Sequence, residues 1–90
     1  MNISIITFTE NGTKLAEKIR QAFVGTKMEE AKKLGLSLSD WTRQQFAEKN
    51  AIVVIGACGI AVRMIAPFVS DKLSDSPVVV ADEAGTFVIP

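Results

Sequence analysis

The chain of 90 residues has no histidine and no tyrosine, and it has only one cysteine and one tryptophan. Without histidine, imidazole metal ligands and the commonest general acid–base group are excluded. A single cysteine excludes a disulfide within the chain and is typical of a reducing compartment, so we expect a cytoplasmic protein. We also expect no metal site and no resident cofactor.

The chain has neither an excess of one charge nor a long apolar run. It carries ten basic and ten acidic residues, so no basic face is implied and nucleic acid is not an expected partner. No apolar run approaches the roughly 18 residues of a membrane span. Because a strand-like run begins at Ile3, we expect no signal peptide. Hydrophobic residues still make up 48% of the chain, which indicates apolar surface that meets another domain or a second copy.

Buried-strand patterns and amphipathic-helix patterns alternate along the chain. Strands are expected near residues 3–8, 51–56, 78–82 and 86–89, and helices near 12–24, 39–49 and 59–66. Gly25 is expected to be the C-cap of the first helix, and Ser37 with Asp40 resembles a capping box for the second. Two interpretations stay open between residues 26 and 38: a short strand near 26–28 or a helical turn near 29–33.

This alternation predicts one α/β domain over residues 1–90. The expected architecture is a three-layer sandwich with a mostly parallel sheet, flavodoxin-like and ending in a strand hairpin about residues 82–85. In such sheets, ligands bind outside the carboxyl ends of the strands. Loops 9–13 and 56–59 each follow a strand and precede a helix, so both are expected on that edge.

The junction between the second clear strand and the third helix is the most informative part of the chain. The strand ends at Gly56, and the helix pattern begins at Gly59, with Ala57 and Cys58 between them. Glycines at such a junction let backbone amides approach an anion at the start of a helix. Arg63, about one turn later, adds a cationic donor. The pattern predicts an anion-binding site.

Several residues are candidates for binding or chemistry. The substrate-binding candidates are Thr9, Gly12, Gly56, Ala57, Cys58, Gly59 and Arg63, and the acid–base candidates are Asp82 and Glu83. Each also has a structural explanation, because Thr9 can cap a helix and Asp82 can serve only a turn. Arg63 can pair with Asp71, and Cys58 lacks the histidine base of a thiol nucleophile, so a packed thiol is favoured there.

The run GACGIAVRMIAP at 56–67 resembles the N-terminal region of the cobalt-precorrin-5A hydrolase family of cobalamin biosynthesis. The similarity continues through DKLSDSP at 71–77, VVV at 78–80, DEAG at 82–85 and FVIP at 87–90, and IITFT at 5–9 with Gly12 agrees as well. It is specific over residues 51–90, weaker over 1–24 and limited to the layout over 25–50. Family members continue into a further segment and a C-terminal domain, so the resemblance implies that such a domain is a partner.

The resemblance also implies a reaction. The family opens the δ-lactone of a cobalt-bound corrin precursor and releases acetaldehyde, and the cobalt belongs to the substrate. The many carboxylates of that substrate suit a glycine loop, a helix N-terminus and Arg63. The resemblance assigns no catalytic residue here, and a chain without a complete nucleophile–base set is expected to be inactive alone.

Two other functions stay open. Residues 7–13 faintly resemble the phosphate loop of flavodoxins, which would hold a flavin phosphate. Glu10 opposes that interpretation with a negative charge in the loop, and few aromatic side chains are available to sandwich a flavin. The third interpretation is a non-catalytic domain that docks a partner domain, which the high apolar fraction favours.

Overall fold

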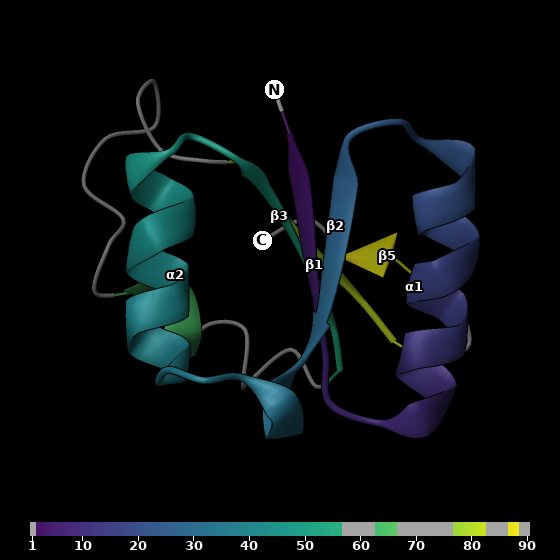
Figure 1. Ribbon diagram of the computed structural model, residues 1–90, viewed down its shortest axis with the longest axis horizontal. Helices are drawn as coiled ribbons and strands as arrows, with labels where there is room; N and C mark the ends of the chain where they lie inside the picture. The colour runs from purple at the N-terminus through teal and green to yellow at the C-terminus, as the bar shows by residue number, and fades with distance from the viewer. Residues whose placement is uncertain (1, 57–62, 67–76, 83–86, 89–90) are drawn as a thin grey trace.

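The computed structural model describes residues 2–56, 63–66, 77–82 and 87–88. Its elements are β1 (Ile3–Thr7), α1 (Glu10–Ala22), β2 (Thr26–Glu30), the 3-10 turn η1 (Ala31–Lys33), α2 (Leu38–Ala47), β3 (Ala51–Ile55), β4 (Val78–Ala81) and β5 (Phe87–Val88). Residues 63–65 add one helical turn. The sheet stands between α1 and α2 (Figure 1), so the predicted three-layer α/β sandwich is confirmed.

The sheet has the strand order β2-β1-β3-β4-β5. The pairs β1–β2, β1–β3 and β3–β4 are parallel, and β5 runs antiparallel to β4. This order is the flavodoxin-like arrangement of doubly wound sheets. The prediction of a mostly parallel sheet that ends in an antiparallel pair is therefore confirmed, although the turn at 83–86 lies outside the described residues.

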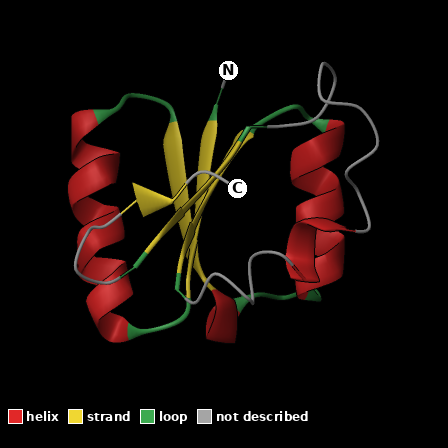
Figure 2. Ribbon diagram, turned by 180° about the vertical axis from the view of Figure 1, so that it is seen from behind, coloured by secondary structure: helices red, strands yellow, loops and turns green. Residues whose placement is uncertain are grey.

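Two apolar clusters hold the layers together, one on each face of the sheet. Figure 2 shows the helices that cover these two faces. Because side chains alternate along a strand, Ile5 and Ile55 face α1, where they pack with Ala16. The side chains that alternate with them in the strands face α2. These are Ile6, Ile52, Val54 and Val80, and they form a cluster with Trp41 of α2 and with Met64 and Ile65. The β-branched runs are therefore buried on both faces, as expected for a parallel sheet.

The boundaries of α1 differ from the prediction at both ends. The helix begins at Glu10 and ends at Ala22, with Phe23 as its C-cap, so the expectation of Gly25 as the C-cap is wrong. The chain leaves the helix at Phe23 and Val24, before it reaches the glycine, and these two residues are 56% and 104% exposed. Gly25 instead takes a φ of 84°, which serves the turn into β2.

Both interpretations of residues 26–38 hold in part. A strand covers Thr26–Glu30, longer than expected, and the 3-10 turn Ala31–Lys33 follows it directly. The hydroxyl of Ser37 then accepts a 3.0 Å hydrogen bond from the amide of Asp40, which confirms the predicted cap of α2. Of the third predicted helix, residues 63–66 are described, and residues 59–62 lie outside the described part.

Candidate functional site

The carboxyl ends of the four parallel strands lie in one row. Glu30 pairs with Thr7 across β2 and β1, Thr7 pairs with Ile55 of β3, and Ile55 pairs with Ala81 of β4. The segments that follow these four residues therefore leave the same edge of the sheet. They contain η1, residues 8–12, Gly56 and Asp82. Ligands of such sheets bind at this edge.

Gly12 holds the first turn of α1 directly against the end of β3. A Cβ atom at this position would lie 3.1 Å from Ile55 Cγ2 and 3.1 Å from Thr9 Oγ1. The amide of Gly12 donates a 3.0 Å hydrogen bond to that Thr9 hydroxyl. The amides of Glu10 and Asn11 have no intrahelical partner, so the positive end of α1 faces this edge.

Gly56 brings the end of β3 against the loop after β1. Its amide donates a 2.9 Å hydrogen bond to the carbonyl of Ala81 in β4. A Cβ atom at Gly56 would lie 3.1 Å from Cδ2 of Phe8, so a larger side chain would press on that ring. Thr9, Gly12 and Gly56 thus lie at one edge, while their role in binding stays a prediction.

The other predicted site residues have mixed outcomes. Arg63 is exposed, and its helical turn is held on the α2 face by Met64 and Ile65, beside α2 in Figure 1. Arg63 and Gly12 therefore lie on elements that cover opposite faces of the sheet. Asp82 is exposed directly after β4. Ala57, Cys58, Gly59, Asp71 and Glu83 lie outside the described residues.

The sequence analysis missed a polar corner at the ends of β1 and β2. The hydroxyls of Thr7 and Thr13 lie 2.8 Å apart, and Oε2 of Glu30 lies 3.0 Å from Nζ of Lys33. Lys33 holds the pKa of the Glu30 carboxyl below its usual value, with smaller contributions from Lys32 and the Thr13 hydroxyl. The predicted strand near 26–28 stops short of Glu30, and a strand extended to Glu30 would place this residue at the carboxyl edge.

A second candidate is a polar cavity of about 140 Å³ between α2 and the neighbouring strands β1 and β2. Two donors converge there on Oε1 of Gln45: the Ser4 hydroxyl at 2.6 Å and the Asn50 amide at 2.8 Å. These buried hydrogen bonds connect α2 to β1 and to the start of β3. We assign the group a structural role, because its members already satisfy one another.

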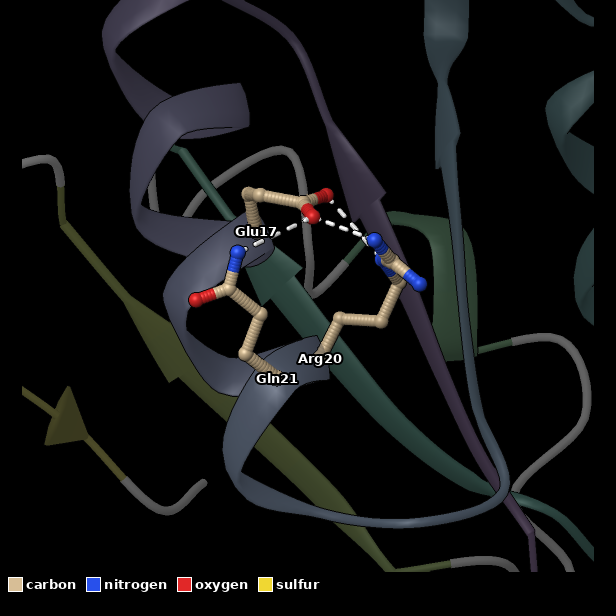
Figure 3. Close-up of polar contacts among 3 residues, drawn as sticks. All are labelled: Glu17, Arg20 and Gln21. Carbon is tan, nitrogen blue, oxygen red and sulfur yellow. Dashed lines mark hydrogen bonds and ion pairs between the residues drawn. The ribbon is translucent and has the colours of Figure 1, made fainter.

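Helix α1 carries a solvent-exposed charge cluster (Figure 3). Nε and Nη2 of Arg20 donate hydrogen bonds to the Glu17 carboxylate, which also accepts a 3.4 Å hydrogen bond from the amide of Gln21. This pairing lowers the pKa of Glu17, with the hydrogen bond from Arg20 as the largest cause. The pairs are exposed and span three or four residues of one helix, so they stabilise α1 slightly and offer no site.

Two classes of feature are missing from the described part of the chain. No group of three or more histidine, cysteine, aspartate or glutamate side chains gathers there as metal ligands. No helix among the described residues is long and apolar enough to cross a bilayer.

Replacing Thr9 by alanine is expected to lower the free energy of unfolding by about 1 kcal/mol, because the cap of α1 is lost. Ser37→Ala removes the equivalent cap of α2 and should cost a similar amount. Urea denaturation measures both variants. A Thr9→Ala variant as stable as the parent would contradict the capping role.

Comparisons with known proteins agree with the fold and with the resemblance. The sequence profile described as "Cobalamin synthesis G N-terminal" matches residues 40–90. The chain is 37% identical, over 95 aligned residues, to the cobalt-precorrin-5A hydrolase of Salmonella typhimurium, covering 98% of this chain and 27% of that protein. A solved cobalamin biosynthesis protein G homologue from Sulfolobus solfataricus is similar in fold, with a TM-score of 0.64, 20% identity and coverage of 92% of this chain and 26% of that one.

The chain thus spans about a quarter of the length of these relatives. The profile matches more than half of the chain, and the Salmonella relative aligns with nearly all of it. The chain belongs to the cobalamin synthesis G N-terminal family.

Proposed function

We propose that the chain acts as the N-terminal domain of a cobalt-precorrin-5A hydrolase and supplies part of the surface that binds the corrin substrate. The observation that carries this proposal is the 37% identity to the Salmonella hydrolase over almost the whole chain. The reaction is the opening of the δ-lactone with release of acetaldehyde, and the rest of that reaction site belongs to the C-terminal part of the longer protein.

The carboxyl edge of the sheet is the part of the chain that suits this substrate. The positive end of α1 lies there, and Gly12 and Gly56 let the first turn of α1 and the loop after β1 pack closely against the end of β3. Lys32 and Lys33 follow β2 at the same edge. Backbone amides and lysine ammonium groups bind carboxylates through charge-assisted hydrogen bonds. The proposed substrate carries many carboxylates.

A chimeric enzyme tests the proposal. The aligned N-terminal part of the Salmonella hydrolase is replaced by this chain, and the chimera is expressed in a strain that lacks the hydrolase. We expect cobalamin-dependent growth and acetaldehyde release from cobalt-precorrin-5A. A folded chimera that supports neither would contradict the proposal.

The chain by itself is expected to release no acetaldehyde. Neither a histidine nor a complete nucleophile–base–orienting set is present among its described residues, and Asp82 is an exposed carboxylate there. The assay compares equal amounts of the isolated chain and the chimera. Turnover by the isolated chain at the rate of the chimera would move the catalytic groups into residues 1–90.

The flavin-binding alternative loses support from the loop after β1. Thr7 is fully buried and its hydroxyl contacts Thr13, while the Thr9 hydroxyl caps α1. These hydroxyls are engaged within the protein rather than presented to a phosphate. A colourless purified protein is therefore expected.

The docking alternative is part of the proposal rather than a rival to it. The exposed Phe23 and Val24 at the end of α1 offer apolar surface to another domain or a second copy. A cytoplasmic location, the absence of a resident cofactor and self-association stay predictions, and light scattering of the isolated chain measures the last of these.

A further inference from the structure

The corner where β2 ends brings together groups from three elements at the candidate edge. Glu30 is the last residue of β2, Lys33 the last of η1, and Thr13 belongs to the first turn of α1. Glu30 and Lys33 form an ion pair of 3.0 Å, in which the Lys33 side chain is 70% exposed and the Glu30 side chain 24%. The cation is thus open to a ligand, while the carboxylate is held against the protein.

The two partners of this ion pair differ in how firmly they are fixed. Glu30 lies in register with Thr7, a fully buried residue of the neighbouring strand β1, and the Thr13 hydroxyl is close enough to Glu30 to lower the pKa of its carboxyl further. Lys33 has a long flexible stem and, within the described residues, pairs only with Glu30. An ammonium on such a stem can exchange one carboxylate for another without any change in the backbone.

We propose that Lys33 binds a carboxylate of the corrin substrate and that Glu30 holds its ammonium at the edge until the substrate replaces it. This inference rests on the proposed function. It makes Lys33 a substrate-binding residue and Glu30 a positioning residue that competes with the substrate for the same ammonium. The two residues should therefore have opposite effects on affinity.

Two further exposed cations are available to other carboxylates of the same substrate. Lys32 lies beside Lys33 in η1, and Arg63 stands exposed on the α2 face. Cations on separate elements can contact separate side chains of one macrocycle, which a single helix terminus cannot do. Because these side chains are exposed, their contributions should be modest individually and should weaken at high salt.

The chain offers a matched control on α1. Glu17 and Arg20 form another exposed ion pair of an acidic residue with a basic residue three positions later. Arg20→Gln changes the net charge by the same amount as Lys33→Gln, and Glu17→Gln matches Glu30→Gln. The control variants therefore separate a local contact from a general effect of charge.

The test titrates the isolated chain and its variants with cobyrinic acid, a cobalt corrin with free carboxylate side chains, followed by visible absorbance. We expect Lys33→Gln to weaken binding about fivefold, as for an exposed charge-assisted contact, and Glu30→Gln to tighten it about twofold. Glu17→Gln and Arg20→Gln should each stay within about 1.5-fold of the parent. Cobinamide, whose peripheral carboxylates are amidated, should bind equally weakly to the parent and to Lys33→Gln.

The possible failures are distinguishable. If the parent binds cobyrinic acid and Lys33→Gln binds it equally well, the inference about Lys33 is wrong and the proposed binding edge stands. If Glu30→Gln weakens binding as Lys33→Gln does, the pair is only structural, and the competition is refuted. If the parent binds no cobyrinic acid at all, the binding role of the edge fails, and the inference fails with it. Circular dichroism verifies that every variant is folded.

Discussion

Replacing Trp41 by alanine is expected to lower the free energy of unfolding by about 3–5 kcal/mol, the usual cost of truncating a buried tryptophan. Trp41 is 2% exposed and belongs to the buried cluster that joins α2 to Ile6 of β1 and to Ile52 and Val54 of β3. A domain of this size has a total stability of only about 5–10 kcal/mol. The variant should therefore unfold at a much lower urea concentration than the parent.

Far-ultraviolet circular dichroism measures the unfolding, because Trp41 is the only tryptophan of the chain and its removal abolishes the fluorescence signal. Phe46→Ala is the control, since Phe46 is a partly buried neighbour on the same helix that packs against the same cluster. It should cost clearly less. A loss below about 1 kcal/mol for Trp41→Ala would show that α2 is held by other contacts.

Replacing Gly12 by valine is expected to cost about 1–3 kcal/mol through overpacking and to abolish corrin binding at the carboxyl edge. A Cβ atom alone would lie 3.1 Å from Ile55 Cγ2 and from Thr9 Oγ1. The two methyl groups of valine would add to this steric overlap, because Ile55 is fully buried and cannot move aside. The first turn of α1 must then shift away from β3, which also breaks the cap made by Thr9.

Gly35→Val is the matched control, because a Cβ atom at Gly35 would meet nothing within 4 Å. Chemical denaturation measures stability, and titration with cobyrinic acid measures binding. If Gly12→Val lost stability but bound the corrin like the parent, the first turn of α1 would not belong to the binding edge. If it lost neither, the close approach of α1 to β3 would itself be wrong.

Much of the architecture could be predicted from local patterns. The β-branched runs at the first and second clear strands are apolar at every position because both faces of a parallel sheet are covered. The periodic apolar positions of α1 and α2 follow from burying one side of a helix. The run after β3, with its glycines and Arg63, also carried the family resemblance, which the comparisons confirm.

The exact ends of the elements were decided by tertiary contacts. Gly25 has the residue type of a C-cap, yet α1 ends at Ala22, and the glycine serves the next turn instead. The charged strand β2 was hardest to predict, because Lys27 and Glu29 interrupt its apolar pattern. It forms through backbone pairing with β1, and a sequence pattern does not show such long-range hydrogen bonds.

The sequence by itself determined the fold class, the family and the residue types available for chemistry, since these depend on local patterning and composition. Only the tertiary structure decided which residues meet. The register of Glu30, Thr7, Ile55 and Ala81 places Lys33 at the same edge as Gly12 and Gly56. The burial of Met64 and Ile65 on the α2 face places the neighbouring Arg63 on the other side of the sheet from Gly12. The physical reason is that parallel pairing joins distant segments at one edge, and the spacing along the chain does not specify that register.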